Sequence, residues 1–258
     1  MEESLRERTE ETQQTLDIEQ NPLEEAPLDD PKVRKKFIRK VYIILAIQLI
    51  FMVAIIYPFV FCEEFKNFVT TERWLHTFLV ICSTFNIVTI LCTIPYFPTK
   101  FPYNFIFLES LVVSIGILVG VFSMLFKVKT IYLGFIETLV LVIVLTAIAF
   151  FSPVDITQYK NIIVMCAILA LVGVLCSIVL LYLFPRDFTI FRIVISLIFI
   201  VIICAYFLYD TQLIMGGKRR SIGPNDYVIA VVHLLMDIAF MFLYIIRCQD
   251  EPMFGLIK

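Results

Sequence analysis

Seven uninterrupted apolar blocks, each about 20 residues long, constrain this chain more than any other feature of its sequence. A helix rises about 1.5 Å per residue, so a block of that length crosses a hydrocarbon core about 30 Å thick. Hydrophobic residues make up 60% of the chain, whereas soluble domains hold about 45–50%. The expected fold is therefore an all-α membrane protein, a bundle of seven transmembrane helices. The blocks cover residues 41–62, 74–94, 105–126, 131–151, 162–184, 188–215 and 225–246.

The links between the blocks are too short to hold a domain outside the membrane. The chain therefore divides into an acidic tail (residues 1–31), a transmembrane domain (residues 32–247) and a short C-terminal tail (residues 248–258). The first 30 residues contain 11 acids and no apolar core, so we expect a disordered extension and no N-terminal signal peptide. A docking role for this acidic tail stays open.

Basic residues predict how the chain is oriented. Six cations lie between Lys32 and Lys40, directly before the first apolar block, and cytoplasmic flanks are the ones enriched in Lys and Arg. The N-terminus is therefore expected in the cytosol. Seven spans would place the C-terminal tail on the far side, whereas six spans with a re-entrant last segment would return it to the cytosol; both stay open.

The seven cysteines show no metal-binding or disulfide pattern. Six of them lie within or beside apolar blocks, and no Cys-x-x-Cys occurs. We expect them to pack as small apolar side chains, and we expect neither a disulfide framework nor a cofactor.

Ionisable residues within the apolar blocks are the candidate functional residues, because each costs roughly 2.5–3.5 kcal/mol on insertion scales. Asp237 lies near the middle of the last block, so it must face the bundle interior or a wet cavity. His233 precedes it by four residues and therefore shares its helix face. The two form a candidate proton or ion sensor, or else a hydrogen bond that only ties helices together. Glu109 and Glu137, each about one turn inside a block, either line a pore or reach out to the interface.

Asp210 is the second intramembrane aspartate, and it precedes the expected helix end at Gly216 by six residues. The sixth and seventh helices are adjacent and antiparallel, so Asp210 and Asp237 can form a pair. Two carboxyls close together in a low dielectric do not both ionise, so the pair would share a proton and sense pH. Fully deprotonated, it would offer oxygen ligands to Ca²⁺. Measured from the connecting loop, Asp237 lies deeper, so the pair meets only if the helices are offset or tilted.

Two segments carry a family resemblance. YDTQLIMGGK (residues 209–218) and LLMDIAFMFLYIIR (residues 234–247) resemble the transmembrane Bax inhibitor motif family, lifeguard branch. VRKKFIRKVYIILAIQL (residues 33–49) is similar to that branch's entry to its first helix, so the resemblance covers about residues 33–247. It implies a seven-helix bundle with the last helix at its centre.

The resemblance also implies roles for particular residues. The family's paired aspartates match Asp210 and Asp237, and Glu109 matches an acid of a Golgi-type branch. A basic residue on the second helix, which partners the pair in bacterial relatives, has no match here. His233 is a candidate for that cationic role.

The function implied by the resemblance is a pH-sensitive calcium leak channel of the endoplasmic reticulum or Golgi that restrains apoptosis. Its expected partners are the lipid bilayer, calcium ions as the transported species and apoptosis-regulating membrane proteins, with no nucleic acid. The alternative is a non-transporting regulator of cell death that acts by protein contacts. We expect no enzyme: an intramembrane aspartyl protease would carry Gly-x-Gly-Asp and Pro-Ala-Leu motifs, which are missing.

Overall fold

The computed structural model describes residues 31–93, 102–159, 189–216, 222 and 226–250. These ranges contain helices and no strand, which confirms the all-α prediction. Five helices are long and apolar enough to cross a membrane, or six if the bent pair of helices Glu63–Thr71 and Trp74–Ile90 forms one span. The acidic tail up to residue 30, the expected fifth span and residues 251–258 lie outside the described ranges.

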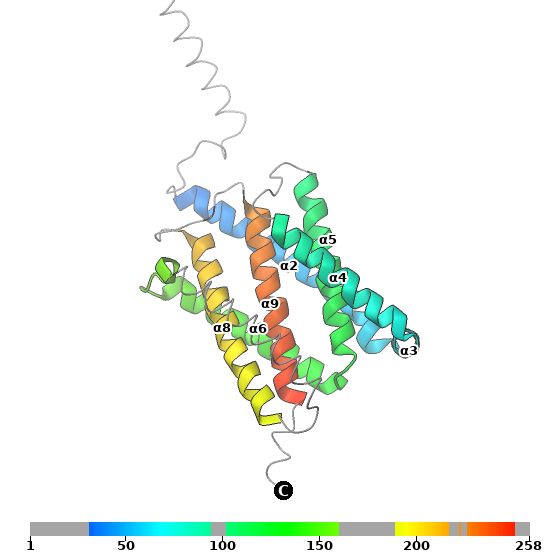
Figure 1. The fold of residues 1–258 in the computed structure, drawn as a ribbon. Coiled ribbons are helices and arrows are strands. Elements are labelled where there is room, and N and C mark those ends of the chain that lie inside the picture. Colours follow the sequence, from blue (N-terminus) through cyan, green and yellow to red (C-terminus); the bar gives the residue numbers. More distant parts are fainter. Residues whose placement is uncertain (1–30, 94–101, 160–188, 217–221, 223–225, 251–258) are drawn as a thin grey trace, which may run out of the picture.

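The helices run back and forth as a bundle (Figure 1). In chain order they are α2 (Pro31–Phe61), α3 (Glu63–Thr71), α4 (Arg73–Thr93), α5 (Tyr103–Ser123), α6 (Val128–Phe151), the 3₁₀ turn η2 (Ile156–Tyr159), α8 (Thr189–Met215) and α9 (Tyr227–Asp250).

Two helices include residues that the hydropathy pattern leaves in links. Helix α2 begins at Pro31, ten residues before the first apolar block, so the cationic segment is a helical extension of the first span. A proline is well tolerated at a first helical position. The expected link after that block folds as α3, with Glu63 and Glu64 in its first turn, where the positive end of the helix dipole favours acids. Helix α3 meets α4 at a bend of 93°.

Helix α9 lies at the centre of the described bundle. It packs against α2, α5, α6 and α8, and Figure 1 shows it between them. Of its most apolar stretch 56% is buried, against 22% for α6. The last apolar segment is thus surrounded by other helices, as a central helix requires.

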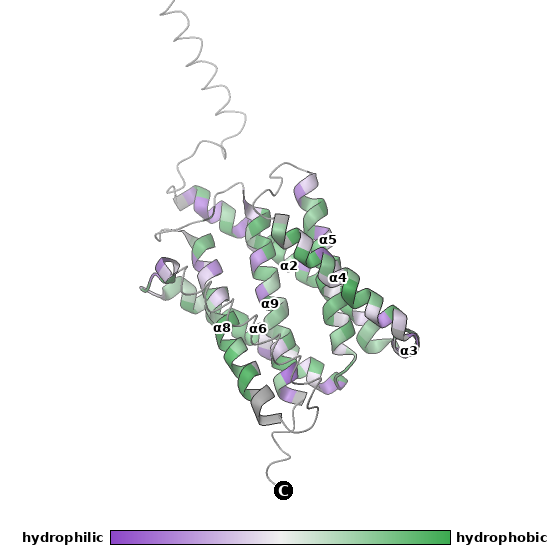
Figure 2. Cartoon of the chain, viewed as in Figure 1, coloured by the Kyte–Doolittle hydropathy of each residue, from purple (hydrophilic) through white to green (hydrophobic). Residues whose placement is uncertain are grey.

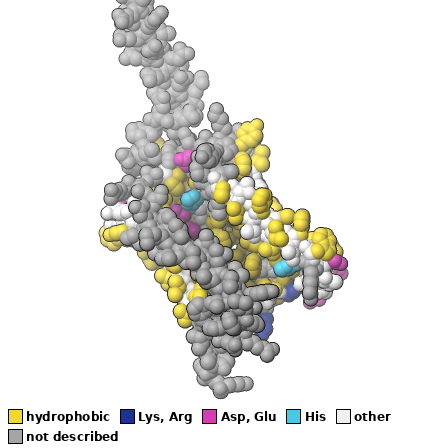
Figure 3. Space-filling model, in the orientation of Figure 1, with side chains coloured by type: hydrophobic (Ala, Val, Ile, Leu, Met, Phe, Trp, Pro, Cys, Tyr) yellow, Lys and Arg dark blue, Asp and Glu magenta, His cyan; other side chains and the backbone are white. Residues whose placement is uncertain are grey.

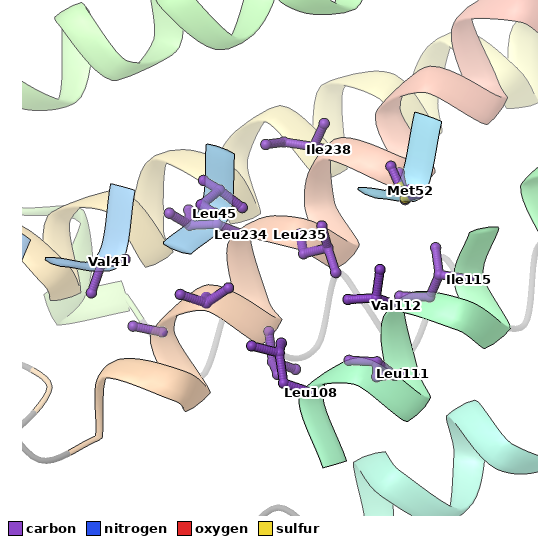
Figure 4. Packing of buried hydrophobic residues seen from close by; sticks show 14 of the residues in the cluster. Val41, Leu45, Met52, Leu108, Leu111, Val112, Ile115, Leu234, Leu235 and Ile238 are labelled. Carbon is purple, nitrogen blue, oxygen red and sulfur yellow. The ribbon is translucent and has the colours of Figure 1, made fainter. Parts of the chain in front are cut away.

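The core joins α2, α5 and α9 (Figure 4). Leu108 and Val112 of α5 and Leu234 and Leu235 of α9 are fully buried, and Leu45 of α2 packs in the same cluster. These buried apolar side chains pack α2, α5 and α9 against one another. Other large apolar side chains of α2, α6 and α8 are exposed, as expected of helices that face lipid.

Candidate functional site

The end of α8 contacts a residue of the segment that joins it to α9. Helix α8 ends at Met215, and Gly216 follows with φ +68°, the left-handed conformation that glycine adopts most readily. This end matches the stop that the two glycines indicate. The N–H of Ile222 donates to the carbonyl of Leu213 at 3.1 Å. Ile222 therefore lies beside the last turn of α8.

Asp210 and His233 meet across this helix pair. Nδ1 of His233 lies 3.2 Å from Oδ2 of Asp210, so a protonated Nδ1 donates to the carboxylate. Asp210 is buried, whereas His233 is only partly buried. The histidine is therefore a bridge between an interior carboxylate and a more accessible position.

Asp237 lies close enough to Asp210 for the two carboxyls to interact. Cys204, six residues before Asp210 on α8, is also near enough to interact with the charge of Asp237. Asp237 therefore lies deeper in the bundle than Asp210. Asp210 has His233 as a neighbour on one side and Asp237 on the other. His233, one turn nearer the start of α9, contacts Asp210 directly, and Asp237 approaches the same carboxyl from one turn deeper.

A hydrogen bond between the two aspartates would require a proton. Two ionised carboxylates hold only acceptors, so one must be protonated to donate. Among the described residues Oδ2 of Asp237 is buried and has no hydrogen-bond partner. Asp210, His233 and Asp237, called here the Asp–His–Asp site, thus form one cluster of three titratable groups.

Figures 2 and 3 place this polar site within the apolar bundle. In Figure 2 hydrophilic residues interrupt the otherwise hydrophobic α8 and α9 in the halves nearer their connection. Figure 3 shows acidic and histidine side chains side by side on the face where these helices lie, among hydrophobic atoms. Within the ranges that the structure describes, no group of three or more His, Cys, Asp or Glu residues is placed to hold a metal ion. A Ca²⁺ ion at the aspartate pair would therefore need backbone or water oxygens to complete its shell of about 6–8 ligands.

Glu109 takes part in a second polar contact, on the other side of the bundle. Nε2 of Gln48 on α2 donates to Oε1 of Glu109 on α5 at 2.6 Å. Nδ2 of Asn86 on α4 donates to the hydroxyls of Ser110, which directly follows Glu109, and of Ser114. Polar side chains thus join α2, α4 and α5 within their apolar surroundings.

The remaining candidate, Glu137, lies apart from these contacts. It is exposed on α6, beside the exposed apolar residues Ile136 and Val140. The structure brings Asp210, Asp237 and His233 together, gives Glu109 a partner, and leaves Glu137 on the outer face of its helix.

Sequence reasoning missed two buried glutamines. Gln212 of α8 is 1% exposed; its Nε2 donates to the carbonyl of Val154, and its Oε1 accepts from the N–H of Ile156, both at 2.9 Å. It therefore ties the segment after α6 to α8. Gln48 similarly holds Glu109. Both stand inside apolar blocks, where an uncharged amide is itself a signal of a buried hydrogen bond.

The chain is similar to known proteins over nearly its whole described length. The model of a family described as "Inhibitor of apoptosis-promoting Bax1" matches residues 34–252. Protein lifeguard 3 of Homo sapiens is 31% identical over 225 residues, which cover 86% of this chain and 71% of that protein. Its Mus musculus counterpart is 28% identical over 222 residues, 85% of this chain and 70% of that protein. Protein LIFEGUARD 4 of Arabidopsis thaliana is 30% identical over 220 residues, covering 84% and 85%.

Proposed function

This chain belongs to the Bax inhibitor and lifeguard family of membrane proteins, and from that premise we propose that it is a pH-sensitive calcium leak channel of intracellular membranes. In this proposal the leak regulates calcium homeostasis and thereby restrains apoptosis. The observation that carries it is the Asp–His–Asp site, in which His233 contacts Asp210 at 3.2 Å and Asp237 lies against the same carboxyl.

The site supplies a proton-controlled tie between α8 and α9. With a protonated His233 and one proton shared by the aspartates, the imidazolium donates to Asp210 and the two carboxyls share a hydrogen bond. Hydrogen bonds to charged groups are stronger than neutral ones, so this form holds the helices together. It is the closed state of the proposed channel.

Acidification weakens this tie. A further proton on the aspartates neutralises Asp210, and His233 then faces a neutral carboxyl instead of a carboxylate. The imidazolium loses its charged acceptor and both groups gain from solvation. Helices α8 and α9 then separate at this level, and calcium flux rises as pH falls.

Glu109 is the second acid of the proposed route. Its contact with Gln48 joins α2 to α5, helices that both pack against α9. We propose this carboxyl as a second acid on the cation's route through the bundle. Glu137, exposed on α6, has no part in the proposed route.

The proposed setting is the membrane of the endoplasmic reticulum or Golgi, with the N-terminus in the cytosol. The described residues of α2 support that orientation, because the cations between Lys32 and Lys40 directly extend its apolar stretch. Membrane proteins that regulate apoptosis are the proposed protein partners.

Calcium release from sealed liposomes tests the proposed activity. Purified full-length protein should release trapped calcium faster at pH 6 than at pH 8, and protein-free liposomes should not. Wild-type protein that releases no calcium at any pH would reject the channel, and would leave a role through protein contacts.

A further inference from the structure

Arg34 is the one cation of the N-terminal cluster for which the structure gives contacts to three backbone carbonyls. Its Nε donates to Met215 at 3.1 Å, its Nη1 to Ile222 at 2.9 Å and its Nη2 to Leu213 at 3.5 Å. Met215 and Leu213 lie in the last turn of α8, where carbonyls lack helical partners and the helix dipole is negative. Ile222 lies in the connection to α9. The guanidinium therefore caps α8 and holds the connection against it.

Gly216 makes room for this contact. A Cβ at Gly216 would clash with Nε, Nη2 and Cζ of Arg34, so the guanidinium packs directly on the glycine backbone. Arg34 also lies over the ring of Phe37, with Cζ 5.5 Å from the centroid. The guanidinium is thus held in place from two sides, by its own helix and by the end of α8.

The start of α9 is held from the same end of the bundle. Nζ of Lys40 lies 3.3 Å from the centroid of the Tyr227 ring, a cation–π contact. Nδ2 of Asn104 on α5 donates to the hydroxyl of Tyr227 at 3.3 Å. Two cations of α2 therefore contact the two helices of the site separately. Arg34 binds the end of α8, and Lys40 packs on the start of α9.

These contacts bear on the Asp–His–Asp site because of their distance along the helices. Asp210 lies one turn before Leu213, and His233 lies six residues after Tyr227. A shift of one helix along the other by a residue, about 1.5 Å, would break a contact of 3.2 Å between His233 and Asp210. We propose that Arg34 is a positioning residue that sets the height of α8 and thereby keeps Asp210 in contact with His233.

This inference rests on the proposed function only for its effect on calcium flux. Its effect on the hydrogen bond of His233 stands apart from transport. The chain has 2 histidines, so selective ¹⁵N labelling of histidine gives a direct probe. His233 reports the site, and His76 on α4 is an internal reference.

The experiment compares full-length wild-type protein with Arg34→Gln and Arg34→Lys in detergent micelles and liposomes. In Arg34→Gln the Nδ1 resonance of His233 should move towards that of a free imidazole, while the His76 resonances stay in place. Calcium flux at pH 7 should rise about two- to thirtyfold, which corresponds to the coupling of about 0.5–2 kcal/mol typical of residues between distant sites. Arg34→Lys keeps the charge but not the planar fork, so it should restore only part of the wild-type signal.

Arg39→Gln is the matched control, because Arg39 is an exposed cation of the same helix and should leave both readouts unchanged. Gly216→Ala is the second variant, since it displaces the guanidinium while Arg34 remains, and it should shift the His233 resonance in the same direction. An unchanged His233 resonance in folded Arg34→Gln and Gly216→Ala would overturn the positioning role. A shifted resonance without any wild-type flux would support positioning and reject the channel.

Discussion

His233 on α9 and Asp210 on α8 contact each other at 3.2 Å although 23 residues separate them. Asp237, one turn beyond His233, lies against the same carboxyl. One aspartate therefore serves two neighbours of opposite character, a base that can carry a positive charge and an acid that can share a proton. This shared use of Asp210 makes the tie between the two helices depend on proton number.

Removing the base should flatten the response to pH. His233→Gln keeps a polar side chain but no titratable ring, so Asp210 loses its only charged donor at the site. We expect calcium flux that varies less than about twofold between pH 6 and pH 8, well under the tenfold change that each pH unit can produce at a single titrating group. His76→Gln, at the other histidine, should keep the wild-type profile.

The contact between Gln48 and Glu109 should contribute to folding stability. Gln48→Leu leaves a carboxyl in the bundle without its donor, and an unsatisfied buried group costs about 1–3 kcal/mol. Thermal unfolding in detergent should therefore show a lower midpoint. The double variant Gln48→Leu/Glu109→Leu should recover most of the loss, because neither polar group remains. Losses that simply add would contradict a direct interaction.

Gln212 should hold the segment after α6 in place. Gln212→Leu leaves the N–H of Ile156 and the carbonyl of Val154 without the partners that the amide supplies. Hydrogen exchange at Ile156 should then quicken by at least about tenfold, which corresponds to roughly 1.4 kcal/mol of lost protection. The exchange of amides in α5 is the control and should not change.

The sequence predicts those features of the structure that depend on one residue and its immediate neighbours. Within the described residues hydropathy predicts the apolar parts of the long helices, and an aspartate inside an apolar run stands out at Asp210 and Asp237. The glycine at position 216 predicts the end of α8. These signals are local, and each follows from one property of a residue in its immediate surroundings.

Other features depend on packing between distant segments. Nothing in the sequence distinguishes Arg34 from its five neighbouring cations, because its role comes from the nearby end of α8 in the fold. The expected link after the first block forms α3, a helix of 9 residues. It is too short and too polar to stand out as an apolar block. Similarly, the contact of His233 with Asp210 depends on how α8 and α9 pack against each other, which no periodicity reveals.

Calcium flux through liposomes containing Asp237→Asn is the most direct test of whether the aspartate pair makes the channel sensitive to pH. The amide keeps the shape of Asp237 but neither ionises nor shares a carboxyl proton. Full-length wild-type protein and the variant should be reconstituted at equal density and assayed from pH 5.5 to pH 8. Calcium flux through the wild-type protein should rise as the pH falls, and flux through the variant should not depend on pH. Flux of wild-type size with an unchanged pH profile in Asp237→Asn would contradict it.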